Sequence, residues 1–343
     1  MTTLGLIAHY PLDANATDAS GHVHHGVVHG AKPTANRFGE ADTALEFDGV
    51  DDYVEVAPPP AIRETCTLSL WARYAPRDLE GYTNCIIAQD DGNDEDQSRR
   101  VFQLSTEHGH VIWHRMIGAR DPMCKARVQF GQWYHVAAVV ENNVHRLYVD
   151  GALADEVRHP FWTHPEQPLH IGRKGTDEPY FFFKGAIDDV RLYDRALSPA
   201  EIDALTRERG WTPPAIPALP ADPVSGRWGK DGVVFLHLRY DGDHGVTGRI
   251  MGGEPHNMAP VERGTFDRAS GAIRLTGQAL DLRANIERDY VIEGFADGEA
   301  ICVLARFGDF SGNFMLTKQG AALRVDPRSI RSQLGAFAFD LFG

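Results

Sequence analysis

The chain has 343 residues, of which 43% are hydrophobic and 24% are charged, a composition that excludes a fibrous or disordered protein. Acidic residues outnumber basic ones by 48 to 34, and the formal net charge of −14 argues against nucleic acid as a partner. No stretch stays apolar over the roughly 18 residues that a membrane-spanning helix needs. Because the N-terminus also has no signal-peptide pattern, we expect a cytoplasmic protein that is not bound to membranes.

Short strands with alternating polar and apolar residues are predicted throughout the first part of the chain. Turn signals such as Asp48-Gly49 and Asp150-Gly151 separate them. Many short strands with almost no helical pattern indicate an all-β, antiparallel sandwich or barrel. The predicted strands are residues 44–47, 53–56, 68–71, 101–104, 133–140, 145–149 and 190–193.

One helix is predicted after these strands, and a break follows it. Ser198 would be its N-cap, with Pro199 and Glu201 in the first turn and Gly210 after the last. Residues 211–223 contain five prolines, a composition that favours an extended linker. We therefore expect a first domain over residues 1–210, joined by this linker to a second one.

A second all-β domain is predicted over residues 224–320. Its strand patterns form a meander of hairpins, and closure into a small antiparallel β-barrel would remove the exposed edges. The last residues, 321–343, include several apolar side chains and are expected to dock on a neighbouring part of the protein. The predicted strands are residues 233–240, 246–251, 264–266, 272–276, 290–295, 300–305 and 313–317.

Residues 6–208 resemble the LamG-like jelly-roll modules of the concanavalin A-like lectin/glucanase superfamily. The resemblance implies two packed antiparallel sheets, commonly with a structural calcium ion and with glycan or protein ligands. The second domain resembles, more loosely, a calycin or lipocalin-type barrel through Gly226-Arg-Trp228. The motifs that carry the first resemblance, in chain order, are His9-Tyr-Pro-Leu-Asp13 with Asp18-Ala-Ser-Gly21 and His25-Gly26, Leu45 to Val56, Thr67 to Trp71, Trp133-Tyr-His-Val136, Leu147 to Gly151, and Lys184 to Ser198.

The same resemblance implies a calcium site. It brings Asp18, in the N-terminal loop, beside Asp188, at the start of a late strand, and Asp13 is a candidate third ligand. Carboxylates and loop carbonyls are the ligands that calcium prefers. The alternative is that these aspartates cap turns by accepting local N–H groups.

Catalytic motifs of the superfamily are missing from the sequence. Its glucanases carry a Glu-x-Asp-x-x-Glu strand, which is absent here, and no nucleophile elbow or phosphate loop occurs. A binding role needs aromatic and polar side chains outside the scaffold motifs. The candidates for ligand contact are Tyr82, Trp113, His114, Arg115, Trp162 and Tyr180.

Two functions of different classes follow from these patterns. The first is a calcium-stabilised, lectin-like protein that binds a carbohydrate or similar polar ligand. The alternative is a cofactor-independent cyclase, isomerase or lyase acting on a small apolar metabolite, with acid–base candidates His114, Arg115, His237 and Asp309. A closed, aromatic-lined cavity with ionisable groups would favour the enzyme, and an open polar groove the binding protein. The sequence does not indicate the oligomeric state.

Overall fold

The structure is a computed structural model that divides into two compact units, Met1–Ala215 and Ile216–Gly343. Each unit is considered by itself. The expected docking of residues 321–343 concerns residues outside the described part of the chain. The structure describes residues 3–75, 84–90, 100–107, 110–114, 124–129, 131–164, 166–175, 181–213, 219–230, 233–251, 258–268, 271–281, 286–296, 298, 300–307 and 310–318.

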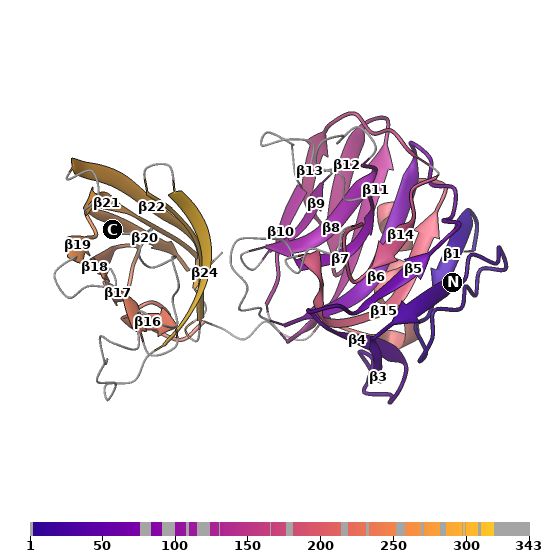
Figure 1. Ribbon diagram of the computed structural model, residues 1–343, viewed down its shortest axis with the longest axis horizontal. Helices are drawn as coiled ribbons and strands as arrows, with labels where there is room; N and C mark the ends of the chain where they lie inside the picture. The colour runs from indigo at the N-terminus through magenta and orange to yellow at the C-terminus, as the bar shows by residue number, and fades with distance from the viewer. Residues whose placement is uncertain are drawn as a thin grey trace. The chain divides into compact units, whose positions relative to one another are not determined.

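Two antiparallel sheets form the first unit (Figure 1). The first, sheet A, has the order β13 (Ala152–Arg158), β12 (Val144–Val149), β11 (Trp133–Glu141), β6 (Cys66–Tyr74), β15 (Lys184–Tyr193), β4 (Ala44–Asp48), β3 (Lys32–Thr34), and β1 (Leu6–Tyr10) also pairs with β15. The second, sheet B, has the order β10 (Cys124–Arg127), β9 (His110–His114), β8 (Phe102–Glu107), β7 (Asn84–Gln89), β14 (Leu169–Ile171), β5 (Tyr53–Val56), β2 (Gly26–His29).

The main core of the first unit lies between these two sheets. Alternate residues of β6, such as Leu68 and Leu70, face it from sheet A, and Leu104 and Leu169 face it from sheet B. Alternation places one side of each strand in the core and leaves the other side for different contacts. The predicted all-β jelly-roll sandwich is confirmed.

The predicted helix covers the outer face of sheet A. Helix α1 (Pro199–Thr206) begins at Ser198, whose hydroxyl accepts a hydrogen bond from the Glu201 backbone while the Glu201 carboxylate accepts one from the Ser198 backbone. Ile202 and Leu205 pack into a second apolar cluster on that face. A short 3₁₀ segment, Glu208–Gly210, follows the helix. Among the described residues, no helix is both long enough and apolar enough to cross a membrane.

The second unit is one antiparallel sheet that bends until its ends meet (Figure 1). The edge strand β20 reaches the turn before β18, where Gly245 bridges Thr265 and the Phe266 N–H donates to the His244 carbonyl over 2.8 Å. The strand order is β19 (Met258–Pro260), β18 (Val246–Met251), β17 (Val233–Tyr240), β16 (Gly226–Lys230), β24 (Phe310–Lys318), β23 (Ala300–Phe307), β22 (Ile286–Ala296), β21 (Ala272–Asp281), β20 (Arg263–Asp267).

Closure of this sheet encloses an apolar core. Trp228 and Phe266 are fully buried there, and Phe266 lies edge-on to Tyr240 at a centroid distance of 5.4 Å. Leu275 and Phe307 also belong to this core. These contacts account for the closed sheet by themselves. The looser resemblance to a calycin-type barrel stays a prediction.

The position of Phe266 at the closure point makes its contribution to stability measurable. Phe266→Ala removes a fully buried ring, and we expect the free energy of unfolding to fall by about 3–5 kcal/mol in thermal or urea denaturation. Leu280→Ala in the same sheet is the control, because Leu280 is 38% exposed and should cost about 0.5 kcal/mol or less. Equal losses for the two variants would contradict the described facing of β20.

Candidate functional site

A β-bulge in β15 places two neighbouring carboxylates on the outer face of sheet A. The pairing of β15 with β6 shifts register between Asp188 and Arg191, and Asp189 has a φ of 53°. Ile187 and Val190, on either side of the two aspartates, are fully buried in the main core. Because the bulge interrupts the regular alternation, Asp188 and Asp189 both point away from that core and line the same pocket.

Arg191 lies between two carboxylates on this face. Its guanidinium binds both oxygens of Asp189, each over 2.9 Å, and both oxygens of Glu208 over 3.0 and 2.8 Å. His9 Nε2 lies 2.8 Å from Asp189 Oδ1, the oxygen that also accepts from Arg191 Nε. Burial alone would raise the pKa of Asp189, but the His9 contact and the charges of Arg191 and Arg37 lower it to about 2. Asp189 is therefore ionised at neutral pH.

A second guanidinium, that of Arg37, is inserted beside Asp188. Arg37 Nη1 lies 2.6 Å from Asp188 Oδ2, and both side chains are 5% exposed. The guanidinium also lies over the rings of Trp71 and Phe38, 4.3 and 4.7 Å from their centroids. Its Nε is buried without a hydrogen-bond partner. Burial raises the pKa of Asp188 to about 7 even though Arg37 opposes the rise.

The loop between β3 and β4 holds Arg37 in this position. Asn36 Oδ1 accepts hydrogen bonds from the backbone N–H groups of Phe38 and Glu40, which fix the turn. The Glu40 carboxylate binds Arg209 through two contacts of 2.5 and 2.8 Å. Hydrogen bonds from Arg209 and Asn36 lower the pKa of Glu40 to about 2. The loop is therefore tied to the segment that follows helix α1.

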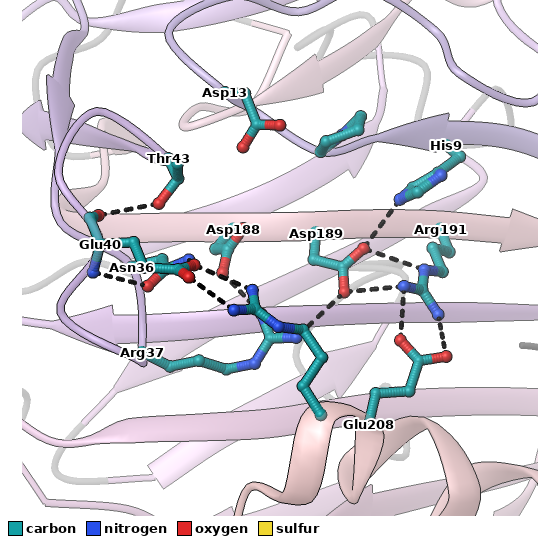
Figure 2. Close-up of a pocket in the computed structure, with 12 residues that line it drawn as sticks. His9, Asp13, Asn36, Arg37, Glu40, Thr43, Asp188, Asp189, Arg191 and Glu208 are labelled. Carbon is teal, nitrogen blue, oxygen red and sulfur yellow. Dashed lines mark hydrogen bonds and ion pairs between the residues drawn. The ribbon is translucent and has the colours of Figure 1, made fainter.

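Together these side chains line an open pocket of about 460 Å³, shown in Figure 2. Asp13, drawn at its upper side, makes no hydrogen bond or ion pair to the other residues of the described chain through its carboxylate. The pocket thus offers carboxylate acceptors and guanidinium donors within one hollow. The lining residues are His9, Pro11, Asp13, Asn36, Arg37, Glu40, Thr43, Asp188, Asp189, Arg191, Glu208 and Arg209.

A model of a known protein family matches most of the first unit. Residues 48–203 match the model of the concanavalin A-like lectin/glucanases superfamily. The match covers 156 of the 343 residues. The resemblance predicted from the sequence motifs is confirmed, and both aspartates of the bulge lie within the concanavalin A-like segment. No curated protein matches the chain.

Several solved structures are partly similar to the chain. Domain 4 of an extracellular arabinanase from Geobacillus stearothermophilus, in complex with arabinotriose, is 20% identical with a TM-score of 0.46, and the match covers 59% of this chain and 98% of that one. A pentraxin from Limulus polyphemus is 16% identical with a TM-score of 0.40, covering 49% and 82%. A sialidase from Trypanosoma rangeli is 18% identical with a TM-score of 0.43, covering 60% and 33%.

Of the three predicted calcium ligands, Asp13 and Asp188 line the pocket and Asp18 is not among its lining residues. Asp18 accepts hydrogen bonds from the backbone N–H groups of His9, Ser20 and His24 over 2.9–3.0 Å, so its carboxylate caps a turn. Asp13 and Asp188 share the pocket, but Asp188 is bound to the Arg37 guanidinium. A fixed positive charge beside Asp188 repels a cation, so this donor set does not fit calcium in the arrangement described.

Another group of carboxylates meets the distance requirement for a metal. The ligand atoms of Asp48, Asp51 and Asp52 lie within 4.8 Å of one another in the turn before β5. Asp48 and Asp52 also accept hydrogen bonds from the backbone of this turn. These backbone contacts account for the positions of the Asp48 and Asp52 carboxylates.

Among the predicted ligand-contact residues, Trp113 requires a correction. Its ring is 2% exposed, stacks on Phe102 at a centroid distance of 5.0 Å, and donates from Nε1 to His145 over 3.0 Å. The ring therefore belongs to the core between the sheets and is not a surface platform. The sequence left the facing of this strand undetermined, because period two does not say which side of a sheet is outside.

His114, the next residue, lies on the opposite side of sheet B. It is 2% exposed and pairs through Nε2 with the Ser105 hydroxyl over 3.0 Å. The strand register places it in line with Gln103 and, two strands further, His170. This row of buried polar side chains lies on the face of the sheet opposite the main core.

Of the remaining predicted residues, Trp162 and His237 fall within the described part of the chain. Trp162 is half-buried, and His237 is exposed on the second unit. Tyr82, Arg115, Tyr180 and Asp309 lie outside the described residues. The acid–base set of the enzyme hypothesis combines His114 of the first unit with His237 of the second. This set stays a prediction.

Sequence reasoning missed most of the charged residues of the pocket. Among the missed residues, Arg37 and Glu208 lie in segments where the sequence shows no binding or catalytic motif. The Asp188-Asp189 pair carried one available signal, since two adjacent polar residues between Ile187 and Val190 break the alternation of a regular strand.

Ionisation of Asp188 gives a testable pH dependence. A pKa raised from 3.8 to about 7 means that the folded state holds this proton more tightly than the unfolded chain. The stability from Asp188 is complete below about pH 4 and is lost as pH rises through about 7, at about 1.4 kcal/mol per pH unit in that window. We expect the unfolding free energy of the wild type, relative to Asp188→Asn, to decline between pH 4.5 and 7 in urea denaturation.

The control for this measurement is Asp194→Asn, which removes an exposed carboxylate just after β15. Its difference from the wild type should show no comparable slope over the same pH range. A pH-independent difference between the wild type and Asp188→Asn would contradict a buried, proton-binding Asp188.

Proposed function

We propose that the first unit is a lectin-like domain that binds a carbohydrate in the charged pocket on the outer face of sheet A. The observation that carries the proposal is the mixture of fixed carboxylates and guanidiniums around one open pocket of about 460 Å³. The match of residues 48–203 to the model of a superfamily of lectins and glucanases supports it. The absence of the glucanase motif from the sequence favours binding over hydrolysis.

Sugar hydroxyl groups suit this mixture of charges. Each hydroxyl donates one hydrogen bond and accepts others, so it can bridge a carboxylate and a guanidinium. Hydrogen bonds to ionised partners are stronger than those between neutral groups. Asp13 offers a carboxylate that makes no such bond to the other described residues, and Arg209 and Glu40 lie at the exposed side of the pocket.

The pocket is also organised before a ligand arrives. Asp189 and Arg191 are held by several hydrogen bonds, and the Glu40–Arg209 pair ties the loop over the site. Because these side chains are already ordered, binding would cost less conformational entropy. The pocket is open and its lining is mainly charged, which is the character expected of a binding protein and not of an enzyme for apolar metabolites.

A glycan array followed by calorimetry with the best-bound oligosaccharide tests this proposal. Asp13→Asn should weaken binding by about tenfold or more, because a charge-assisted hydrogen bond contributes about 1.5–3 kcal/mol. Glu64→Gln is the matched control, since it removes one exposed carboxylate outside the pocket and should leave affinity unchanged. The proposal is wrong if the array retains no saccharide, or if both variants bind equally.

Calcium dependence is a separate question, and it has a direct measurement. Because Asp18 caps a turn and Asp188 pairs with Arg37, we expect the melting temperature of the full chain to be the same in calcium and in chelator. A bound ion at a hundredfold excess over its Kd would instead stabilise the protein by about 2.7 kcal/mol. A calcium-dependent rise that Asp188→Asn abolishes would restore the site implied by the sequence resemblance.

A further inference from the structure

Among the described side chains of β16, β17 and β18, those on the outer face of the second unit are cationic or neutral. The register places Arg227 of β16 opposite His237 of β17, and His237 opposite Arg249 of β18. Arg239 lies two residues along β17, opposite Thr247. The residues between them, such as Trp228 and Leu238, face the core, so this row points outward.

Within the described part of the second unit, none of Arg227, His237, Arg239 and Arg249 makes a side-chain hydrogen bond or ion pair. The acidic groups at the end of this face, in the turn after β17, are Asp241 and Asp243. Asp241 accepts hydrogen bonds from the backbone of Asp243 and Gly245, and Asp243 lies 3.5 Å from His244. These contacts of the Asp241 and Asp243 carboxylates are therefore all with residues of the same turn.

Another part of the same sheet shows a different arrangement. On β21, β22 and β23, the Glu293 carboxylate lies between two arginines, bonding Arg274 with one oxygen and Arg306 with the other. Gln278 also donates to Asp289 across the strands over 2.9 Å. Like charges on neighbouring strands destabilise a sheet, and here an opposite charge relieves them. In the described part of the chain, no carboxylate pairs in this way with the arginines on β16, β17 and β18.

We propose that this row, Arg227, His237, Arg239 and Arg249, binds an acidic polysaccharide with a carboxylate on each sugar ring. The charge of such a chain complements the row. Neighbouring strands are about 4.8 Å apart, so the backbones at Arg227 and Arg249, which lie two strands apart, are separated by about 10 Å. An extended chain lying across the three strands would bring separate carboxylates to the two arginines, with His237 between them.

The protein's charge favours a polysaccharide over nucleic acid. Duplex DNA carries one charge per about 1.7 Å of its axis, and proteins that bind it use extended basic surfaces. This row has three arginines in a protein with a formal net charge of −14. The row lies on the second unit and shares no residue with the pocket proposed for the first.

Polygalacturonate and its fully methyl-esterified form are the probes, because the ester keeps the sugar backbone but replaces the charged carboxylate of each ring with a neutral methyl ester. We expect the full-length protein to bind polygalacturonate and not the ester, with affinity falling as salt rises. Arg227→Gln with Arg249→Gln should reduce affinity by about tenfold or more. The same pair should lower the slope of log affinity against log salt by about two, one for each arginine.

The matched control is Arg274→Gln with Arg306→Gln, which removes two arginines already neutralised by Glu293. It should leave polygalacturonate affinity within about twofold of the wild type. Circular dichroism and melting curves establish that both double variants are folded. The Asp13→Asn variant should bind polygalacturonate normally, which separates this site from the pocket of the first unit.

Four results would overturn the proposal. These are the absence of polygalacturonate binding, equal binding of the methyl ester, equal losses in the two double variants, and a loss in Asp13→Asn. Tighter binding of a DNA duplex than of polygalacturonate would assign the row to nucleic acid instead. Failure of the array experiment on the first unit leaves the expected results here unchanged.

Discussion

The charges around Arg191 hold together parts of the chain that are far apart in sequence. His9 comes from the first strand, Arg37 from the loop before β4, Asp188 and Asp189 from the last strand of the sandwich, and Glu208 from the segment after helix α1. Removing one partner of a buried pair leaves an uncompensated charge, at a cost of about 3–5 kcal/mol. The pocket therefore has a rigid floor, and its shape depends on these contacts.

The same network explains why Asp188 and Asp189 differ although they are neighbours. Asp189 receives contacts from His9 and Arg191 that favour its charged form, whereas Asp188 has Arg37 alone against a larger effect of burial. The bulge makes both orientations possible at once, because a regular strand would send one of the two side chains into the apolar core. One extra residue in the pairing thus creates two carboxylates with separate properties.

The sequence predicted features that depend on local patterns and missed those that depend on register. The Ser198 capping box, the alternating strands of both units and the sandwich are local or repeated along the chain, and all of these are found. The facing of Trp113 and the partner of Asp188 depend on contacts with distant residues, which no single pattern encodes. His237 appeared in the sequence as an isolated acid–base candidate, since only strand pairing places it between Arg227 and Arg249.

Closure of the second unit has a consequence for how the chain folds during synthesis. The first described strand of that unit, β16, pairs with the last described one, β24, where Trp228 lies opposite Lys318. Contacts between residues so distant in sequence form slowly, because the loop between them must be ordered first. The apolar side chains of β17 and β18 thus stay unprotected on the ribosome until β24 has emerged, whereas every pairing of the sandwich is already available.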